Sequence, residues 1–312
     1  MTSTIRVCEV SEFGGPEVLR AVERPRPVAR PGEVVVSIAA ANINPTDLGA
    51  RSGTVRRRAP NLQPPFVPGW DLAGVVSDLG EGVSRYAVGD RVVGMIPWIR
   101  IGGRVGAYAE AAAVDPDWLA PRPDGLDEVA GATVPLNTLT ARQALDLIAA
   151  PPGATLLVTG ASGAVGGFAT QLAVKDGLRV VAVASDGDED WVASLGAAEV
   201  VSRATDLGRL HPVDAVLDAV PVGGAAAAAA RDGGVVVFTR RVGDVAGGRD
   251  LKVHSPLVHT DPVALASLTR MAASGALRTR VNRTLDLVDA AEAHRLVERG
   301  ALRGKVVLTM NS

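Results

Sequence analysis

The chain has 312 residues, of which 47% are hydrophobic and 21% charged, and its formal net charge is −2. This balance is typical of a globular protein and argues against nucleic-acid binding, which needs a basic surface. The one cysteine, Cys8, excludes a disulfide within the chain, and no apolar run reaches the ~18 residues of a membrane span. The first stretch also lacks the basic and apolar regions of a secretory signal, so we expect a cytoplasmic protein that binds no membrane.

The first 120 residues predict a β-rich region. Short β-branched runs at 33–43 and 71–80 are bounded by proline, glycine and aspartate, as strands between turns are. Nine of the 20 prolines lie between Pro16 and Pro68, which disfavours long helices there. The basic, proline-rich segment 51–65 predicts an exposed loop.

From about residue 123 the pattern changes to alternating helices and strands. A helical segment at 126–150, interrupted at Pro135, comes first. The expected strands that follow are 155–160, 179–184, 198–201, 213–220 and 233–239, and the expected helices are 164–177, 189–196 and the alanine-rich run 225–230. This alternation predicts a parallel sheet with helices on both faces. Two further helices, 261–277 and 287–300, precede a last strand at 304–310.

A glycine-rich bend, GASGAVG, joins the first of these strands to its helix. Small residues let the backbone turn sharply and let a pyrophosphate approach the amide N–H groups of a helix N-terminus. Because a strand precedes and a helix follows, the bend predicts a dinucleotide site; a tight turn without a ligand is the alternative. The residues expected to contact the cofactor here are Gly160, Ala161, Ser162, Gly163, Ala164 and Val165.

The end of the second strand bears on the choice between NADPH and NADH. Ser185 could donate a hydrogen bond to the 2′-phosphate of NADPH, whereas the acidic residues of the segment 186–190 would repel it. An acidic residue at the strand end would instead bind the 2′-hydroxyl of NADH. Asp188 to Asp190 suit the N-terminus of the helix 189–196, whose dipole they complement, and Asp186 stays ambiguous.

Eight segments, spread over almost the whole chain, resemble in order and spacing the zinc-independent quinone oxidoreductases of the medium-chain dehydrogenase/reductase superfamily. They are NINPTDLGARSG (42–53), PFVPGWDLAGVV (65–76), GEGVSRYAVGDRVVGM (80–95), GAYAEAAAV (106–114), LNTLTARQAL (136–145), VTGASGAVGGFATQLA (158–173), SLGAAEVV (194–201) and GALRGKVVLTM (300–310). The resemblance implies an α/β protein of two domains. Residues 1–122 with 262–312 would form a GroES-like β-barrel domain, and residues 123–261 a Rossmann dinucleotide-binding domain with a doubly wound parallel sheet.

The residues themselves argue against zinc. A catalytic zinc needs three protein ligands and a structural zinc site four cysteines, yet Cys8 is alone and none of the four histidines lies in the first 120 residues. Each histidine is expected to be a surface or capped residue. Where zinc-dependent relatives carry the first cysteine ligand this chain has Asn44, and where they carry Gly-His-Glu it has Gly69-Trp70-Asp71. No metal is therefore expected.

The resemblance places Asn44 beside the nicotinamide, and Asp47 and Arg51 belong to the same motif, so these three are the candidate catalytic residues. The amide of Asn44 could donate a hydrogen bond to the oxygen of an acceptor that gains a hydride. The alternative is a helix start, with Asn44 or Thr46 as its cap. Many relatives carry a tyrosine after the R-x-G stretch at 51–53; this chain lacks it, so any proton would come from water.

The resemblance also implies further contacts to the cofactor. Thr140 matches a position near the nicotinamide, and a loop that passes the same side of the cofactor here reads Thr239, Arg240 and Arg241. Arg203 replaces a tyrosine of the family and could supply the cation for a 2′-phosphate.

The expected activity is hydride transfer from NADPH, with NADH possible, to a quinone or an activated alkene. The alternatives are an enone or enoyl-thioester reductase in a biosynthetic pathway, and a nucleotide-binding protein of the same family without turnover. The expected partners are a small-molecule substrate and a second copy of the chain. In that homodimer the strand 233–239 could be an edge strand.

Overall fold

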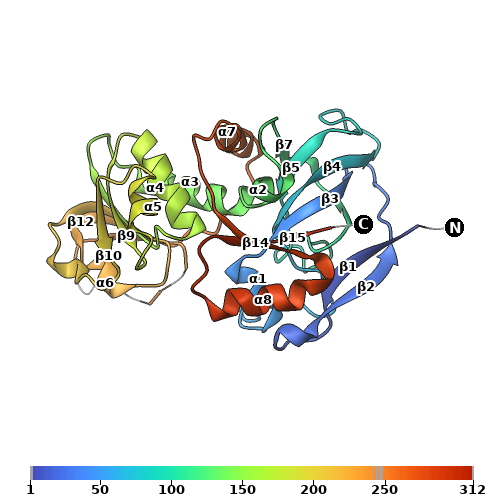
Figure 1. The fold of residues 1–312 in the computed structure, drawn as a ribbon, viewed down its shortest axis with the longest axis horizontal. Helices are drawn as coiled ribbons and strands as arrows, with labels where there is room; N and C mark the ends of the chain where they lie inside the picture. The colour runs from blue at the N-terminus through green and yellow to red at the C-terminus, as the bar shows by residue number, and fades with distance from the viewer. Residues whose placement is uncertain (1–2, 241, 244, 246–248, 311–312) are drawn as a thin grey trace. The chain divides into compact units, whose positions relative to one another are not determined.

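The computed structural model describes residues 3–240, 242–243, 245 and 249–310, and the chain divides into two compact units (Figure 1). Unit 1 takes residues 1–136, 259–276 and 280–312, and unit 2 takes 137–258 with 277–279. Unit 1 extends beyond residue 122 because a short helix, α2 (Glu128–Ala132), packs against its strands. The domain bounds expected from the sequence stay a prediction.

Unit 1 is built on a mostly antiparallel sheet of seven strands. Its strands run in the order β14-β15-β3-β4-β5-β7, and β6 pairs with β3. Their bounds are β3 (Val34–Asn42), β4 (Asp71–Leu79), β5 (Arg91–Met95), β6 (Ala111–Val114), β7 (Leu119–Pro121), β14 (Val281–Asp286) and β15 (Lys305–Thr309). A separate antiparallel pair consists of β1 (Thr4–Val10) and β2 (Leu19–Pro25). The two strands predicted most clearly, 33–43 and 71–80, are β3 and β4.

The last strand of the chain joins the first long strand of the same sheet. Strand β15 is parallel to β14 and antiparallel to β3, with Val307 opposite Asn42. Val306, Val307 and Leu308 are buried in the core, whereas Lys305 before them is only partly exposed. This register brings Lys305 to the end of β3, which leads into helix α1 (Pro45–Arg51).

The remaining helices of unit 1 are short or amphipathic. They are α7 (Pro262–Ala273) and α8 (Ala290–Arg299), with the 3-10 turns η1 (Pro16–Val18), η2 (Pro116–Trp118) and η4 (Leu287–Asp289). The helical segment predicted at 126–150 is two helices, α2 and α3 (Pro135–Ile148). Pro135 begins α3, where its missing N–H costs no helical hydrogen bond.

Unit 2 contains a six-stranded sheet in the order β10-β9-β8-β11-β12-β13, and every neighbouring pair is parallel. Its strands are β8 (Thr155–Thr159), β9 (Arg179–Ala184), β10 (Glu199–Ser202), β11 (Val213–Asp218), β12 (Ala230–Phe238) and β13 (Lys252–His254). Numbered within the unit, the order is 3-2-1-4-5-6, which is the Rossmann order. The strand order, not the strand direction, reverses between β8 and β11, and such sheets bind ligands at this point.

The helices of unit 2 are α4 (Ala164–Lys175), α5 (Glu189–Ala193) and α6 (Gly224–Ala227), with the 3-10 turn η3 (Leu207–Arg209) and most of α3. The alanine-rich run is shorter as a helix than the sequence predicted. Ala230 already pairs with Val213 as the first residue of β12, because its side chain belongs to the apolar core of the sheet. The edge-strand prediction for 233–239 is wrong, since β12 is paired on both sides and β13 lies at the edge.

Candidate functional site

The glycine bend of unit 2 is a turn that only glycine can make at two points. Gly160 follows β8 with a φ of 63°, and a Cβ there would lie 2.7 Å from Cγ1 of Val220. A Cβ on Gly166, within α4, would lie 2.3 Å from the carbonyl oxygen of Gly160. The close approach of helix to strand therefore requires glycine, as it does in dinucleotide-binding loops.

Side chains at the carboxyl ends of the strands are tied to this bend. Oγ of Ser162 accepts a hydrogen bond of 2.9 Å from the backbone N–H of Ser185, which follows β9. At the end of β11, the buried carboxylate of Asp218 accepts a bond of 2.5 Å from Oγ1 of Thr159. Thr239 donates from its backbone N–H and its hydroxyl to the carbonyl of Asp218. The structure thus brings Ser162, Ser185 and Thr239 to one edge of the sheet.

The candidate for a 2′-phosphate cation is paired with an acid. Nη2 of Arg203 lies 3.4 Å from Oδ2 of Asp186, and both side chains are about two-thirds exposed, at 68% and 69%. The backbone N–H of Arg203 donates to the carbonyl of Ala184 at the end of β9. The guanidinium of Arg203 therefore lies near the carboxyl end of β9, but it is paired with the carboxylate of Asp186.

Two other predicted cofactor residues, Thr140 and Arg240, take no part in the contacts described above. Thr140 lies half-buried within α3, and Arg240 is exposed directly after Thr239. Arg241 lies outside the described residues.

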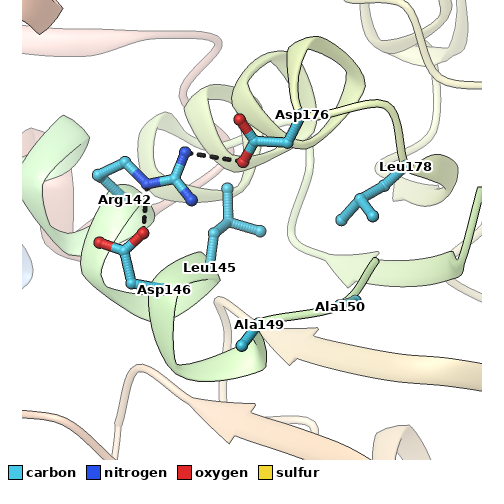
Figure 2. Close-up of a pocket in the computed structure, with 7 residues that line it drawn as sticks. All are labelled: Arg142, Leu145, Asp146, Ala149, Ala150, Asp176 and Leu178. Carbon is cyan, nitrogen blue, oxygen red and sulfur yellow. Dashed lines mark hydrogen bonds and ion pairs between the residues drawn. The ribbon is translucent and has the colours of Figure 1, made fainter. Parts of the chain in front are cut away.

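A cavity of about 510 Å³ opens on unit 2, and none of the residues that line it belongs to the glycine bend. Figure 2 shows these lining residues. Arg142, which lines the cavity, forms ion pairs with Asp146 at 2.9 Å and with Asp176 at 2.7 Å. Asp176 is the C-cap residue that follows helix α4, and Leu178 precedes β9, so the cavity lies at the amino ends of the strands. Parallel sheets bind ligands at the opposite, carboxyl edge, and we do not assign the cofactor to this cavity.

In unit 1, a buried polar cluster surrounds Asn44, the N-cap residue that precedes α1. Nδ2 of Asn44 donates to Oδ2 of Asp71 at 2.7 Å, and its Oδ1 accepts from Nδ2 of Asn42 at 3.1 Å and from Nζ of Lys305 at 3.0 Å. Asn42 also donates to Oδ2 of Asp71 at 3.0 Å. Oδ1 of Asp71 accepts a hydrogen bond from the backbone N–H of Leu136 at 2.6 Å. The carboxamide of Asn44 is therefore held from both ends.

Burial moves the pKa values of two groups in this cluster, Asp47 and Lys305, towards neutral pH. Burial raises the pKa of Asp47 to about 7, against the opposing effect of the hydrogen bond from the backbone of Asn44. Oδ1 of Asp47 is buried and has no hydrogen-bond partner among the described residues. Burial also raises the pKa of Asp71 and lowers that of Lys305 to about 8. Groups that titrate near pH 7 in a buried cluster are typical of functional sites.

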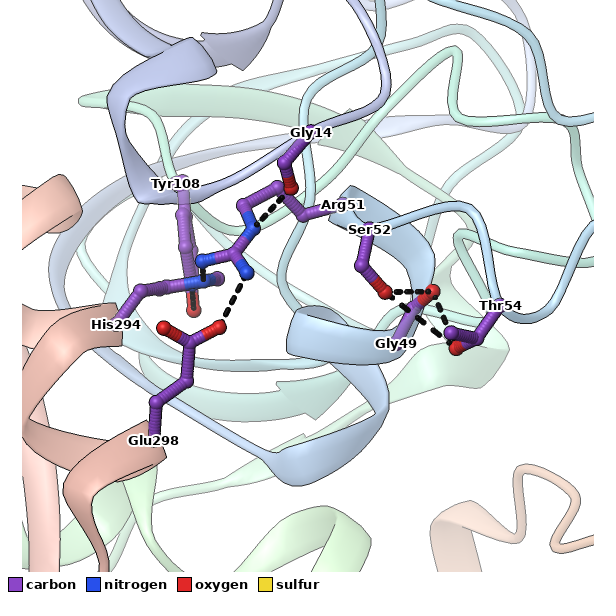
Figure 3. A network of polar contacts seen from close by, with 8 residues as sticks. All are labelled: Gly14, Gly49, Arg51, Ser52, Thr54, Tyr108, His294 and Glu298. Carbon is purple, nitrogen blue, oxygen red and sulfur yellow. Dashed lines mark hydrogen bonds and ion pairs between the residues drawn. The ribbon is translucent and has the colours of Figure 1, made fainter.

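Arg51 contacts His294, which contacts Tyr108 (Figure 3), and Tyr108 extends this chain of contacts to Asp47. Nη1 of Arg51 lies 3.5 Å from Nδ1 of His294, whose Nε2 is 3.1 Å from the hydroxyl of Tyr108. The same hydroxyl lies 3.4 Å from Oδ2 of Asp47, which also accepts the backbone N–H of Asn44 at 2.8 Å. Because arginine only donates, Nδ1 of His294 must accept, so Nε2 donates to Tyr108 and Tyr108 donates to Asp47.

The guanidinium of Arg51 serves packing between helices. It forms an ion pair with Glu298 of α8 and donates from Nε to the carbonyl of Gly14 at 3.2 Å (Figure 3). Arg51 is 2% exposed. Asn44 and Asp47 are thus brought together directly, whereas Arg51 reaches them only through His294 and Tyr108.

Among the members of these networks that sequence reasoning missed are His294, Tyr108 and Lys305. His294 is fully buried on the inner side of α8, so the prediction that every histidine is a surface or capped residue is wrong for it. The sequence feature that could have indicated its burial is the helical spacing of Ala290 and Ala293, which lie on the same buried face of α8 as His294. Tyr108 gave no signal. Lys305 was visible only as a lone cation before three buried residues of the last strand.

The donor set around Asn44 does not suit a zinc ion. No group of three or more histidine, cysteine or acidic side chains that could hold a metal occurs among the residues that the structure describes. At the positions where zinc-dependent relatives have ligands, Asn44 and Asp71 bond to each other, and the ammonium of Lys305 lies 3.0 Å from Oδ1 of Asn44. A cation bound there would be repelled by that ammonium.

Two family models match the chain. Residues 30–124 match the alcohol dehydrogenase GroES-like domain, and residues 195–308 match the zinc-binding dehydrogenase domain. The chain belongs to the medium-chain dehydrogenase/reductase superfamily. The predicted fold class, a GroES-like domain with a Rossmann domain, is confirmed for this member of the superfamily.

Its relatives in the superfamily include quinone oxidoreductases. The quinone oxidoreductase of Rattus norvegicus is 38% identical over 204 residues, which are 64% of this chain and 59% of that protein. The 2-methylene-furan-3-one reductase of Solanum lycopersicum is 32% identical over 248 residues, 77% of this chain and 63% of that protein. The match thus spans about six-tenths of these relatives.

A solved structure covers the chain more completely. The quinone oxidoreductase from Coxiella burnetii matches 99% of this chain and 100% of its own, with a TM-score of 0.90 and 28% identity.

Among the described residues, no helix is both long and apolar enough to cross a membrane.

Proposed function

We propose that the protein is a zinc-independent oxidoreductase that transfers hydride from NAD(P)H to a quinone or an activated alkene. One observation carries the proposal: the carboxamide of Asn44 is oriented by Asp71 and Lys305, and not by a metal ligand set. The nitrogen of a carboxamide has two hydrogens, and the bond to Asp71 uses one. The second can donate to the oxygen of an acceptor.

The chemistry asks little of the protein besides orientation and charge stabilisation. A reduced nicotinamide, when bound, supplies the hydride. When the acceptor takes it up, negative charge develops on the carbonyl oxygen of the quinone or enone. A hydrogen bond from Nδ2 of Asn44 would stabilise that charge, as donors of an oxyanion hole do, and water would then deliver the proton.

We assign cofactor binding to the carboxyl edge of the sheet in unit 2. The residues that would hold the pyrophosphate are those of the bend, Gly160 to Val165, while Thr239 and Arg240 follow a neighbouring strand. Thr140 is retained as a contact to the nicotinamide on the family resemblance. Ser185 and Arg203 favour NADPH, and Asp186 leaves NADH possible.

The second candidate is an enone or enoyl-thioester reductase with the same cofactor. The tomato relative, whose name describes the reduction of an activated alkene, favours it. A nucleotide-binding protein without turnover is the third. A homodimer and a cytoplasmic location complete the proposal.

The test is a titration of the purified protein with NADPH and with NADH, followed by 1,4-benzoquinone or a simple enone. We expect oxidation of the cofactor, and a kcat about 100-fold lower in Asn44→Ala, because one donor to the developing oxyanion is lost. Asn61→Ala, in an exposed turn, is the matched control and should leave kcat unchanged. Tight cofactor binding with no oxidation by either acceptor would favour the non-catalytic candidate.

A further inference from the structure

Lys305 is an unusual member of the polar cluster in unit 1. It begins β15, and the three residues after it are buried in the core. Its side chain does not turn to open solvent but places Nζ 3.0 Å from Oδ1 of Asn44. An ammonium in such a position loses much of its hydration, so its contacts must compensate for that loss.

The contacts of Lys305 and Asp71 together leave the Asn44 amide one orientation. An ammonium has only donors and a carboxylate only acceptors. Oδ1 of Asn44 therefore points to Lys305, and Nδ2 points to Asp71 at 2.7 Å. The charged donor also polarises the amide, which strengthens the remaining N–H as a donor. A neutral lysine would still reach Oδ1, but with a weaker bond than a charge-assisted one.

We propose that the ammonium of Lys305 is a positioning group for the reduction: with Asp71 it fixes the amide of Asn44 so that the free Nδ2–H meets the acceptor oxygen. Lys305 acts through Asn44 and does not itself touch the acceptor. This inference rests on the proposed function, in which Asn44 is the donor. It adds the residue that a metal-free centre uses to orient that donor.

The charged groups around Lys305 make its role depend on pH. Two carboxylates face it, Asp71 from β4 and Asp47 from α1, and the carbonyl of Arg280, before β14, accepts its backbone N–H at 2.8 Å. Burial lowers the pKa of Lys305 to about 8, although both carboxylates oppose the shift. The proposed orienting charge is therefore present at neutral pH and is lost in mild alkali.

Kinetics of two substitutions provide the first test. Lys305→Met should lower kcat by about 10–100-fold, with the KM for the acceptor within about threefold, because orientation is lost and not binding. Lys305→Arg keeps a charged donor and should retain kcat within about tenfold. Lys252→Met, an exposed lysine of β13, is the matched control. A wild-type kcat in Lys305→Met would overturn the proposal.

The pH profile distinguishes orientation by charge from a purely structural role. In the wild type, kcat should fall above about pH 8, whereas in Lys305→Arg it should stay level to higher pH, because arginine does not lose its proton. If Lys305→Met fails to fold, this comparison still decides. The same alkaline fall in wild type and Lys305→Arg would contradict the proposal.

A second readout is independent of turnover. The chain has six asparagines and three glutamines, so the ¹⁵N spectrum of side-chain amides holds few signals, and Asn44→Ala identifies one of them. We expect the Asn44 signals to shift with a midpoint near pH 8, and this transition to vanish in Lys305→Arg. Signals that do not move would overturn the orientation by Lys305. If they move but no acceptor is reduced, the proposed function fails and the orientation stands.

Discussion

His294 illustrates how a single buried group makes stability depend on pH. Burial lowers its pKa to about 3, and the guanidinium of Arg51 acts in the same direction. In the unfolded chain this histidine takes up a proton near pH 6.5. In the folded protein it stays neutral until the pH falls to about 3. The free energy of unfolding therefore falls as the pH falls through this window. Asp47 acts in the opposite direction, because the folded protein protonates it near pH 7 and the unfolded chain near 3.8.

We predict that His294→Gln reduces the acid sensitivity of the fold. Glutamine can accept from Arg51 and donate to Tyr108, as the neutral imidazole does, but cannot be protonated. Relative to wild type, its unfolding free energy should fall less between pH 6.5 and pH 4, by up to ~1.4 kcal/mol per pH unit. Urea unfolding at several pH values measures this, with the exposed His211→Gln as control. Equal slopes in all three proteins would show that His294 is not neutral when folded.

We also predict that Asp186 limits the preference for NADPH. Asp186→Asn removes the carboxylate that now pairs with Arg203 and frees the guanidinium for a 2′-phosphate. Because exposed pairs contribute only ~0.2–1 kcal/mol, the ratio of kcat/KM for NADPH over NADH should rise about 1.4- to fivefold. Steady-state kinetics with both cofactors test it. Asp190→Asn, also acidic and exposed, should leave the ratio unchanged.

At the residue scale, the sequence predicted the types of the site residues better than their partners. Asn44 was singled out, but Asp71 and Lys305 lie 27 and 261 residues from it in the chain, and only the pairing of β15 with β3 brings the lysine close. Arg51 was predicted with Asn44 because they share a motif. The helix between them directs Arg51 to α8 instead.

At the element scale, the most reliable predictions were those with strong local patterns. Alternation of apolar runs and helical segments placed β8, α4 and β9 within a few residues, because glycines mark their ends. The alanine run forms a shorter helix than predicted, because helix propensity gave way to burial and pairing in β12 at its end. The edge strand β13 has three residues, too few for any periodicity to reveal.

The glycine bend gives a prediction at this scale. Gly166→Ala would place a methyl group 2.3 Å from the carbonyl oxygen of Gly160, a backbone atom that cannot rotate away. Helix α4 must then shift from β8, which should cost about 1–3 kcal/mol and weaken cofactor binding strongly. Thermal unfolding and a fluorescence titration with NADPH test both effects. Gly224→Ala, where a Cβ meets nothing within 4 Å, should be neutral; equal losses in both would contradict the prediction.

At the scale of the whole molecule, the remaining prediction concerns a second copy of the chain. Light scattering should give twice the chain mass of 32.0 kDa at micromolar concentration. With β12 enclosed, β13 lies at one edge of the sheet in unit 2 and β10 at the other; we expect β13 to pair with another copy, because unpaired edges favour such association. A mass of one chain at every concentration would show that this edge stays solvated.

The return of β15 to the sheet of unit 1 also has a consequence for biosynthesis. All of unit 2 is synthesised between β3 and the strand that completes the sheet beside it. Domains fold as units while the chain emerges from the ribosome, so unit 2 can fold while its neighbour still lacks a strand. Lys305 arrives with that strand, after all of unit 2 has been translated. A nascent chain would therefore acquire the glycine bend before the oriented amide of Asn44.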